Sequence, residues 1–239
     1  INGGENWIKY LGWSSCSHVP DIAFSPLTPD TIFAATDILG EFDGGVFKST
    51  DQGESWNKNS VGITATVISS VAIDPQNQNR IYAGEGNGHF YRSQDGGTNW
   101  EHEYLGADEF TDIKIDPVNS ANVYLASLSG LYKSEDYGDN FMEISEVENP
   151  ERIAINPLSS NTIYVGSSLR GIYKTTNGGT TWEQKNNGLP ELMAGMFMPI
   201  ISIAIDPNDT SVVWAGTYQE GIVKSLNGGN EWINKGLNN

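Results

Sequence analysis

The chain has 239 residues and a formal net charge of −17 at pH 7, from 30 acidic and 13 basic side chains. So large an excess of negative charge argues against nucleic acids and anionic membranes as partners. The single cysteine, Cys16, excludes an intrachain disulfide, and no run of about 18 apolar residues predicts membrane insertion.

A short pattern recurs along the chain at intervals of about 40–50 residues, which is the spacing of a solenoid or propeller unit. In each copy a Ser or Thr and an Asp or Asn can cap the turn amides, while glycine takes a positive φ. Because Asn replaces Asp at Asn2, Asn177 and Asn227, turn capping explains the pattern better than a set of metal or substrate ligands. The copies are INGGENW at 1–7, KSTDQGESW at 48–56, RSQDGGTNW at 92–100, KSEDYGDNF at 133–141, KTTNGGTTW at 174–182 and KSLNGGNEW at 224–232.

Each full copy closes a unit in which three short strands precede the turn and a fourth follows it. The first strand alternates apolar and polar residues and ends at Asx-Pro or Ser-Pro, as in DIAFSP at 21–26 and SVAIDP at 70–75. Four antiparallel strands in such a unit match one propeller blade. The sequence predicts one all-β domain, a β-propeller of about five four-stranded blades at residues 21–60, 70–104, 112–145, 152–186 and 202–236.

The strands predicted at the two ends of the chain do not determine whether the ring is closed. Residues 1–10 are expected to form the outer strand of a split or preceding blade, although the fifth blade has a fourth strand of its own at 231–235. We expect a five-bladed disc with an extra strand; the alternative is a portion of a larger ring. An unpaired terminal strand would dock on blade five or drive self-association through blade edges.

Strand direction separates the loops into two faces. The turns between strands three and four share one face with the turns between strands one and two. The blade-to-blade crossovers and the loops between strands two and three share the opposite, top face, where propeller ligands usually bind. Because these top-face loops vary in length, we expect any functional site there.

The turns resemble the Asp-box, or BNR, repeat S-x-D-x-G-x-x-W of sialidases, sortilin-type receptors, xyloglucanases and photosystem-assembly propellers. Residues 49–56 and 93–100 match it strictly, and the resemblance spans the whole chain. It implies the propeller fold but does not choose among enzymes, receptors and assembly factors. The residues expected to be structural are Ser49, Asp51, Gly53, Trp56, Ser93, Asp95, Gly97, Trp100, Ser134, Asp136, Gly138, Phe141, Thr175, Asn177, Gly179, Trp182, Ser225, Asn227, Gly229 and Trp232.

Asp37 lies in the segment ATDILGEFDGGVFKS, which resembles the strand-end context of the catalytic Asp of xyloglucanases. This resemblance implies a glycoside hydrolase with Asp37 as a catalytic carboxylate, and Glu85 or Glu220 as candidate partners on the same face. Because that family places its second carboxylate on another seven-bladed domain, we expect the chain alone not to hydrolyse β-glucans. The alternative is a loop acid that caps its own turn.

Sialidase activity and metal binding each lack the residues that they need. A sialidase resemblance would imply three converging arginines, whereas only Arg152 and Arg170 are expected near the top face. Cys16 and His18, with the other histidines, match no structural zinc spacing, and the acidic loops match no calcium loop. No metal or cofactor is predicted.

Aromatic residues in the top-face segments favour binding over catalysis, because they can form platforms for sugars or peptides. We therefore predict a non-catalytic, secreted or cell-surface module that binds carbohydrate or protein. A glycoside hydrolase domain and a structural assembly subunit are the alternatives. The candidate ligand-binding residues are Trp13, His18, Asp37, Glu85, Phe110, Arg170, Phe197 and Tyr218.

Overall fold

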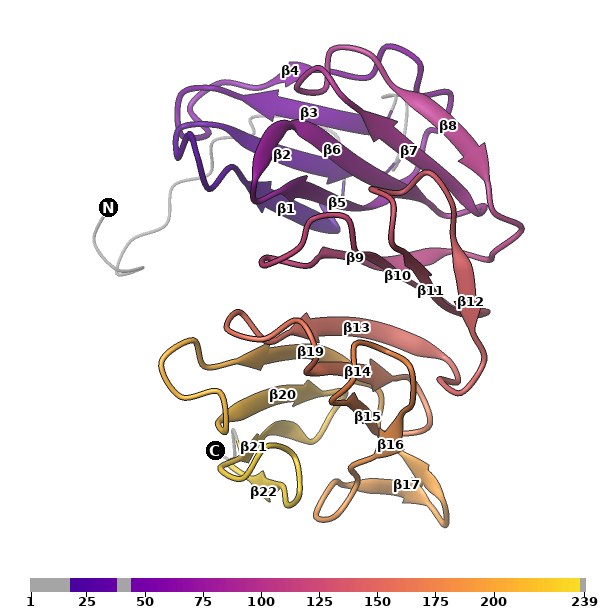
Figure 1. The fold of residues 1–239 in the computed structure, drawn as a ribbon, viewed down its shortest axis with the longest axis vertical. Helices are drawn as coiled ribbons and strands as arrows, with labels where there is room; N and C mark the ends of the chain where they lie inside the picture. The colour runs from indigo at the N-terminus through magenta and orange to yellow at the C-terminus, as the bar shows by residue number, and fades with distance from the viewer. Residues whose placement is uncertain (1–17, 38–43, 237–239) are drawn as a thin grey trace.

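The computed structural model describes residues 18–37 and 44–236. This part contains five four-stranded antiparallel sheets, each with its strands paired in chain order, and one two-stranded hairpin (Figure 1). We refer to the sheets as blades one to five. Residues 18–37 and 44–236 contain no helix, and so none that could span a membrane.

Blades one and two consist of β1 (Asp21–Phe24), β2 (Ile32–Thr36), β3 (Gly45–Ser49) and β4 (Asn57–Lys58), and of β5 (Ile68–Asp74), β6 (Asn77–Glu85), β7 (His89–Ser93) and β8 (Glu101–Tyr104). Blades three and four consist of β9 (Phe110–Ile115), β10 (Val123–Ser127), β11 (Gly130–Ser134) and β12 (Met142–Ile144), and of β13 (Pro150–Ile155), β14 (Ile163–Ser167), β15 (Ile172–Thr175) and β16 (Glu183–Gln184). The hairpin β17 (Glu191–Met193) and β18 (Met196–Phe197) precedes blade five, which consists of β19 (Ile200–Ile205), β20 (Val213–Thr217), β21 (Gly221–Ser225) and β22 (Ile233–Asn234).

The first strand of every blade lines one central cavity of about 480 Å³. In Figure 1 these five strands lie toward the middle of the molecule, and β4, β8, β12, β16 and β22 lie at its periphery. Residues of the first strands that line it include Ile22, Val71, Ile113, Ile153 and Ile203. The all-β propeller predicted from the sequence is confirmed.

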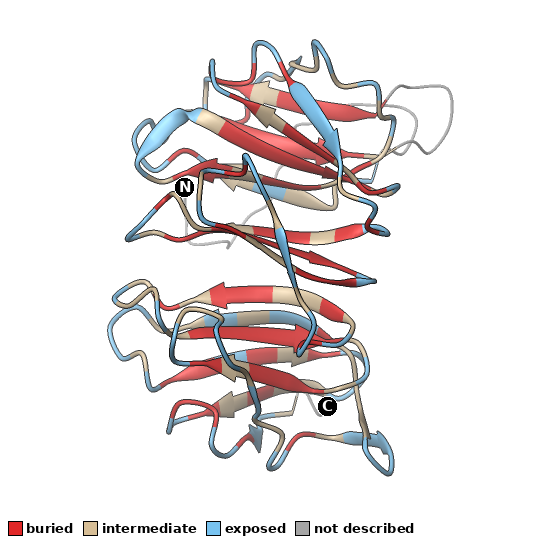
Figure 2. Ribbon diagram, turned by 45° about the vertical axis from the view of Figure 1, so that its right-hand side comes forward, coloured by how far each residue is buried: buried red, intermediate tan, exposed pale blue. Residues whose placement is uncertain are grey.

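Apolar clusters join each blade to the next. Phe33 and Val46 of blade one, for example, pack with Val71 and Ile81 of blade two. Equivalent clusters join blades two and three, three and four, and four and five. Figure 2 shows buried residues concentrated on the inner strands and exposed residues on the outermost strands and the turns.

Blades five and one do not share such a cluster in the described part of the chain. Ile22 and Phe24 of blade one are 49% and 65% exposed, and Trp214 of blade five is 37% exposed. The expected five-bladed disc is therefore not closed by direct packing of these two blades. The predicted extra strand at residues 1–10 lies outside the described residues.

The Asp-box turns are closed by hydrogen bonds from within their own blade. In blade one, Ser49 Oγ accepts the Gly53 N–H at 2.8 Å, and Asp51 Oδ1 accepts the Ser55 N–H at 2.9 Å. The Trp56 indole N–H donates to the Gly53 carbonyl at 3.0 Å. Gly53 has a φ of 90°, which glycine adopts at little cost.

Each Asp-box turn also bonds to the turn between the first two strands of its blade. The Gln52 N–H donates to the Asp30 carbonyl at 3.0 Å, and the Gly96 N–H donates to the Asn79 carbonyl at 2.9 Å. These two kinds of turn therefore lie on one face, as strand direction predicts. The loops between second and third strands lie at the opposite ends of the blades.

Three of the turns carry a carboxylate that is stabilised in its charged form. The hydrogen bond from the Ser55 side chain lowers the pKa of Asp51 to about 2, and the Asn140 side chain lowers the pKa of Asp136 to about 2. The Asn99 backbone N–H is the main cause of a lowered pKa at Asp95.

Acidification should therefore weaken the first three blades. Because the folded-state pKa of Asp51 and of Asp136 is depressed from the ordinary 3.8 to about 2, their contribution is present above pH 3.8 and is lost as the pH falls toward 2. We expect the melting temperature of an Asp51→Asn, Asp136→Asn double variant to depend less steeply on pH across this window. Calorimetric scans at several pH values measure the slope.

The fourth blade offers the reverse variant as a matched control. Its turn carries Asn177, whose Oδ1 accepts the Thr181 N–H at 3.0 Å in the same geometry. Asn177→Asp should steepen the acid dependence of the melting temperature. Equal slopes for the parent chain and both variants would contradict the assignment of acid sensitivity to these turns.

Candidate functional site

Asp37 directly follows β2, at the end of that strand opposite the Asp-box turn. Its backbone N–H donates to the His18 carbonyl at 3.2 Å, and its Oδ2 lies 3.1 Å from His18 Nδ1. The other carboxylate oxygen, Oδ1, is buried and has no hydrogen-bond partner among residues 18–37 and 44–236. A buried polar atom without a partner is rare in folded proteins, and a catalytic role or a bound water is among its explanations.

The turn-capping alternative for Asp37 stays a prediction. A capping carboxylate accepts nearby backbone N–H groups, as Asp51 does from Ser55, and residues 38–43, which follow Asp37, lie outside the described residues. The described hydrogen bond of the Asp37 carboxylate joins it to His18, whose side chain is 62% exposed, whereas that of Asp37 is 24% exposed. Asp37 therefore has one oxygen oriented by a histidine, and its side chain is partly accessible to solvent.

The two candidate partner carboxylates lie in different surroundings. Glu85, at the end of β6, is 8% exposed and accepts hydrogen bonds from the Tyr91 hydroxyl at 3.2 Å and from Asn87 Nδ2 at 3.4 Å. Burial raises the pKa of Tyr91, so its hydroxyl remains a donor to Glu85. Glu220 is exposed. No hydrogen bond joins either of them to Asp37 within residues 18–37 and 44–236.

The aromatic candidates separate into buried and exposed side chains. The prediction that Phe110 binds ligand is wrong, because its ring is 0% exposed within the cluster between blades two and three. Gly84 makes room for it, since a Cβ there would lie 2.8 Å from the Phe110 Cβ. Phe197 packs partly buried against the cluster of blades four and five, and Tyr218 is 54% exposed. Trp13 lies outside the described residues.

Arg170 is bound by an acidic side chain. Its Nε donates to Glu148 Oε2 at 2.8 Å, and the two side chains are 40% and 57% exposed. The backbone N–H of Arg170 also donates to Ser167 Oγ at 3.0 Å. Arg170 is thus held on the loop after β14, and the Glu148 carboxylate balances its positive charge.

A set of charged residues at one end of the central cavity was not predicted from the sequence. Asp21 Oδ2 accepts the Val71 N–H at 3.0 Å, and Asp112 Oδ2 accepts the Ile153 N–H at 2.8 Å. Burial raises the pKa of Asp21, although Lys114 opposes this effect. The detectable signal was the Asp that opens both DIAFSP and DIKIDP. Each of these acids ties the first strand of its blade to that of the next blade.

Metal binding finds no support in the part of the chain that the structure describes. No three side chains among His, Cys, Asp and Glu there form a group that could hold a metal ion.

Comparison with known proteins relates the chain to a family of polysaccharide hydrolases. No family model matches it. The chain is 26% identical to a xyloglucanase of Paenibacillus sp in an alignment of 234 positions that covers 74% of this chain and 22% of the relative. It is 28% identical to a xyloglucanase of Hypocrea jecorina in an alignment of 221 positions that covers 69% of this chain and 25% of the relative. The chain is thus similar in sequence to xyloglucanases, and its fold is a propeller with Asp-box turns.

The solved structures support the same fold. A GH74 enzyme of Niastella koreensis superposes with a TM-score of 0.75 at 21% identity, over 91% of this chain and 38% of that chain. The chain spans about a quarter of the length of the curated relatives that it matches.

These relatives overturn the main functional prediction from the sequence. A non-catalytic interaction or carbohydrate-binding module was expected because no complete set of catalytic residues could be recognised in the sequence. The xyloglucanases to which the chain is similar are enzymes, and they are the class that the resemblance around Asp37 implied. The alternative, a glycoside hydrolase or a domain of one, is the better supported of the two.

Proposed function

We propose that the chain is a domain of a secreted xyloglucan-cleaving glycoside hydrolase and that Asp37 is one of its catalytic carboxylates. The observation that carries this proposal is Asp37 itself. Its Oδ2 lies 3.1 Å from His18 Nδ1, and its Oδ1 has no partner within the part of the chain that the structure describes. A partly exposed carboxyl group that a histidine orients can exchange a proton with a bound substrate, as general acid–base catalysis requires.

Glycoside hydrolysis needs a second carboxylate, about 5–10 Å from the first across the scissile bond. Glu85 is a poor candidate, because its two oxygens already accept bonds from Tyr91 and Asn87 and its side chain is buried. Glu220 is exposed, and the described structure links it to no other catalytic candidate. We therefore assign the second carboxylate to a partner domain that faces Asp37 across a cleft.

The proposed substrate class rests on the relatives and on what a site must provide to bind a long polysaccharide. A long polysaccharide needs an open site and contacts to its sugar rings. Tyr218, on the loop after β20, is 54% exposed and can stack on a sugar. Because such a polymer does not cross membranes, its hydrolysis takes place outside the cell.

A hybrid enzyme tests the proposal. This chain would replace the aligned segment of the Paenibacillus sp xyloglucanase, and reducing ends released from xyloglucan would be measured. We expect hydrolysis by the hybrid and none by the chain alone. A hybrid that melts cooperatively and binds xyloglucan but releases no reducing ends would refute the catalytic assignment. Hydrolysis by the chain alone would place both carboxylates within it.

A further inference from the structure

The dipeptide Asn-Gly recurs along the chain, and the surroundings of its copies differ. Asparagine followed by glycine loses its side-chain amide most readily, because glycine has no side chain to shield the backbone nitrogen that attacks the amide. Asparagine is accordingly counted among the thermolabile residues. In a folded protein, the reaction also requires that the amide and the nitrogen are free to meet. The pairs lie at 2–3, which is outside the described residues, and at 87–88, 177–178, 187–188 and 227–228.

The pair at 177–178 shows how an Asp-box turn protects its asparagine. The Gly178 N–H donates to the Asn161 carbonyl at 3.0 Å, so the attacking nitrogen is held. Asn177 Oδ1 accepts the Thr181 N–H at 3.0 Å, and Asn177 Nδ2 donates to Thr181 Oγ1 at 2.9 Å. Both reacting groups would have to leave these bonds before they could meet.

The pairs at 227–228 and 87–88 are held in a similar way. Gly228 is buried, and its N–H donates to the Ser211 carbonyl at 2.8 Å. Gly88 is also buried, and its N–H donates to the Glu85 carbonyl at 3.3 Å. Asn87 Nδ2 donates to Glu85 Oε1 at 3.4 Å. In each pair the attacking nitrogen is therefore both bonded and shielded from water.

The pair at 187–188 lacks this protection. Both residues are exposed, and the Gly188 N–H makes no hydrogen bond within residues 18–37 and 44–236. Asn187 Nδ2 lies 3.5 Å from the Asn230 carbonyl, which is the outer limit of a hydrogen bond. The two residues are the middle of a short turn, in which the Leu189 N–H donates to the Asn186 carbonyl at 3.0 Å.

We propose that Asn187 is a site of spontaneous deamidation in the folded protein. The Gly188 backbone nitrogen loses its proton to a base in the solvent and attacks Asn187 Cγ. The N–Cγ bond forms, the Cγ–Nδ2 bond breaks, and the departing nitrogen takes a proton from water and leaves as ammonia. Water then opens the five-membered succinimide at one of its two carbonyls, which gives aspartate or isoaspartate. No atom is oxidised or reduced.

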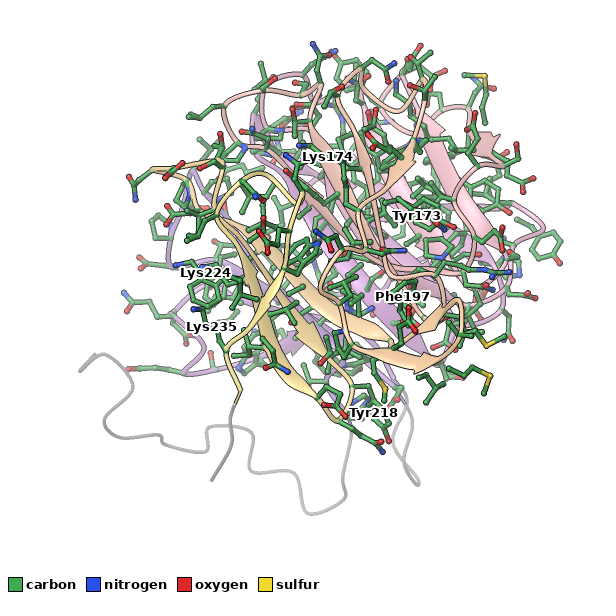
Figure 3. All side chains as sticks on the ribbon, turned by 90° about the horizontal axis from the view of Figure 1, so that it is seen from below. Tyr173, Lys174, Phe197, Tyr218, Lys224 and Lys235 are labelled. Atoms are coloured by element: carbon green, nitrogen blue, oxygen red, sulfur yellow. The ribbon has the colours of Figure 1, made fainter. Side chains whose placement is uncertain are left out.

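The turn at Asn187 joins blade four to blade five, so isoaspartate there has a structural effect. The Asn187 carbonyl accepts the Trp232 N–H at 2.8 Å, and a Cβ on Gly188 would lie 2.1 Å from the Trp232 carbonyl oxygen. Lys174 lies at the same boundary, where its Nζ donates to the Gly228 carbonyl at 2.7 Å (Figure 3). Isoaspartate lengthens the main chain by one methylene at this close contact and should therefore loosen the boundary.

The boundary between blades one and two has the same contact without the amide. The Val61 carbonyl accepts the Trp100 N–H at 2.8 Å, and a Cβ on Gly62 would lie 2.1 Å from the Trp100 carbonyl oxygen. A valine thus fits the turn position that Asn187 occupies. Asn187→Val is therefore a matched variant that keeps the turn and removes the reactive side chain.

Peptide mapping by mass spectrometry tests the proposal on the purified chain, aged in mildly alkaline buffer. We expect Asn187 to exchange its amide for a carboxyl group at least about tenfold faster than Asn87, Asn177 and Asn227, which must first break their hydrogen bonds. In urea, where the fold is lost, the rates at all four residues should become similar. Ageing should lower the melting temperature of the parent and not that of Asn187→Val.

Two results would overturn the proposal. One is deamidation of Asn87, Asn177 or Asn227 as fast as that of Asn187 in the folded chain. The other is an Asn187 that stays intact in the folded chain but reacts in urea, because the fold would then protect it too. Isoaspartate at Asn187 without a fall in melting temperature would refute the effect on the boundary between blades four and five.

Discussion

Replacing Asp37 with Asn in the hybrid enzyme should lower xyloglucan hydrolysis by about 10²–10⁴-fold, the usual contribution of a general acid or base. Asn has nearly the same shape and keeps an oxygen that can accept from His18 Nδ1, which lies 3.1 Å from Asp37 Oδ2 in the parent. It cannot carry the proton. The loss should therefore fall on kcat, while the affinity for xyloglucan oligosaccharides, measured by calorimetric titration, changes little.

The matched control for this variant is Asp30→Asn. Asp30 lies on the opposite face, where its Oδ1 accepts from Gln52 Nε2 at 2.7 Å. Its replacement should leave hydrolysis unchanged. Loss of affinity rather than kcat in Asp37→Asn would make Asp37 a binding residue, and equal activity of both variants would remove it from the mechanism.

Phe110→Ala should be the most destabilising of the single substitutions considered. The Phe110 ring is 0% exposed between blades two and three, with Ile113 and Leu125 in the same cluster. Truncation of a buried phenylalanine to alanine typically costs about 3–5 kcal/mol, from lost burial and from the cavity that remains. Urea unfolding followed by circular dichroism measures the free energy of unfolding.

Tyr218→Ala is the control, because Tyr218 and Phe110 were both predicted from the sequence to bind a ligand. Tyr218 is 54% exposed, so its truncation should change the free energy of unfolding by less than about 0.5 kcal/mol. It should weaken binding of xyloglucan oligosaccharides instead. A stable Phe110→Ala variant with impaired binding would reverse the two assignments.

The repeated turns and alternating strands made the blades predictable, because the required residues are local. Ser49, Asp51 and Gly53 form one turn by themselves, and their pattern marks where one strand ends and the next begins. The surroundings of Phe110 were not predictable in this way. Phe110 is the first residue of β9. Its ring is buried where Gly84 of the neighbouring blade, which has no side chain, leaves room for it.

The site was predictable only in part. The strand-end context selected Asp37 as a candidate, but no local pattern could show that His18, 19 positions earlier in the chain, orients its Oδ2. The relation between blades five and one also depends on contacts between segments far apart in the sequence. The number of predicted strands allowed an open ring or a closed one, and the exposure of Trp214 and Phe24 argues against direct packing of these two blades in the described part of the chain.

The restriction of the apolar clusters to consecutive blades has a consequence for folding. Each blade pairs its strands in chain order, and the apolar clusters join each blade to the one that follows it in the sequence. The loops that these clusters close are therefore shorter than the loop that contact between the first and the last blade would close, and a shorter loop costs less chain entropy. In the described residues no late step has to join the first blade to the last. Folding can therefore begin at any pair of blades and extend in both directions, one blade at a time.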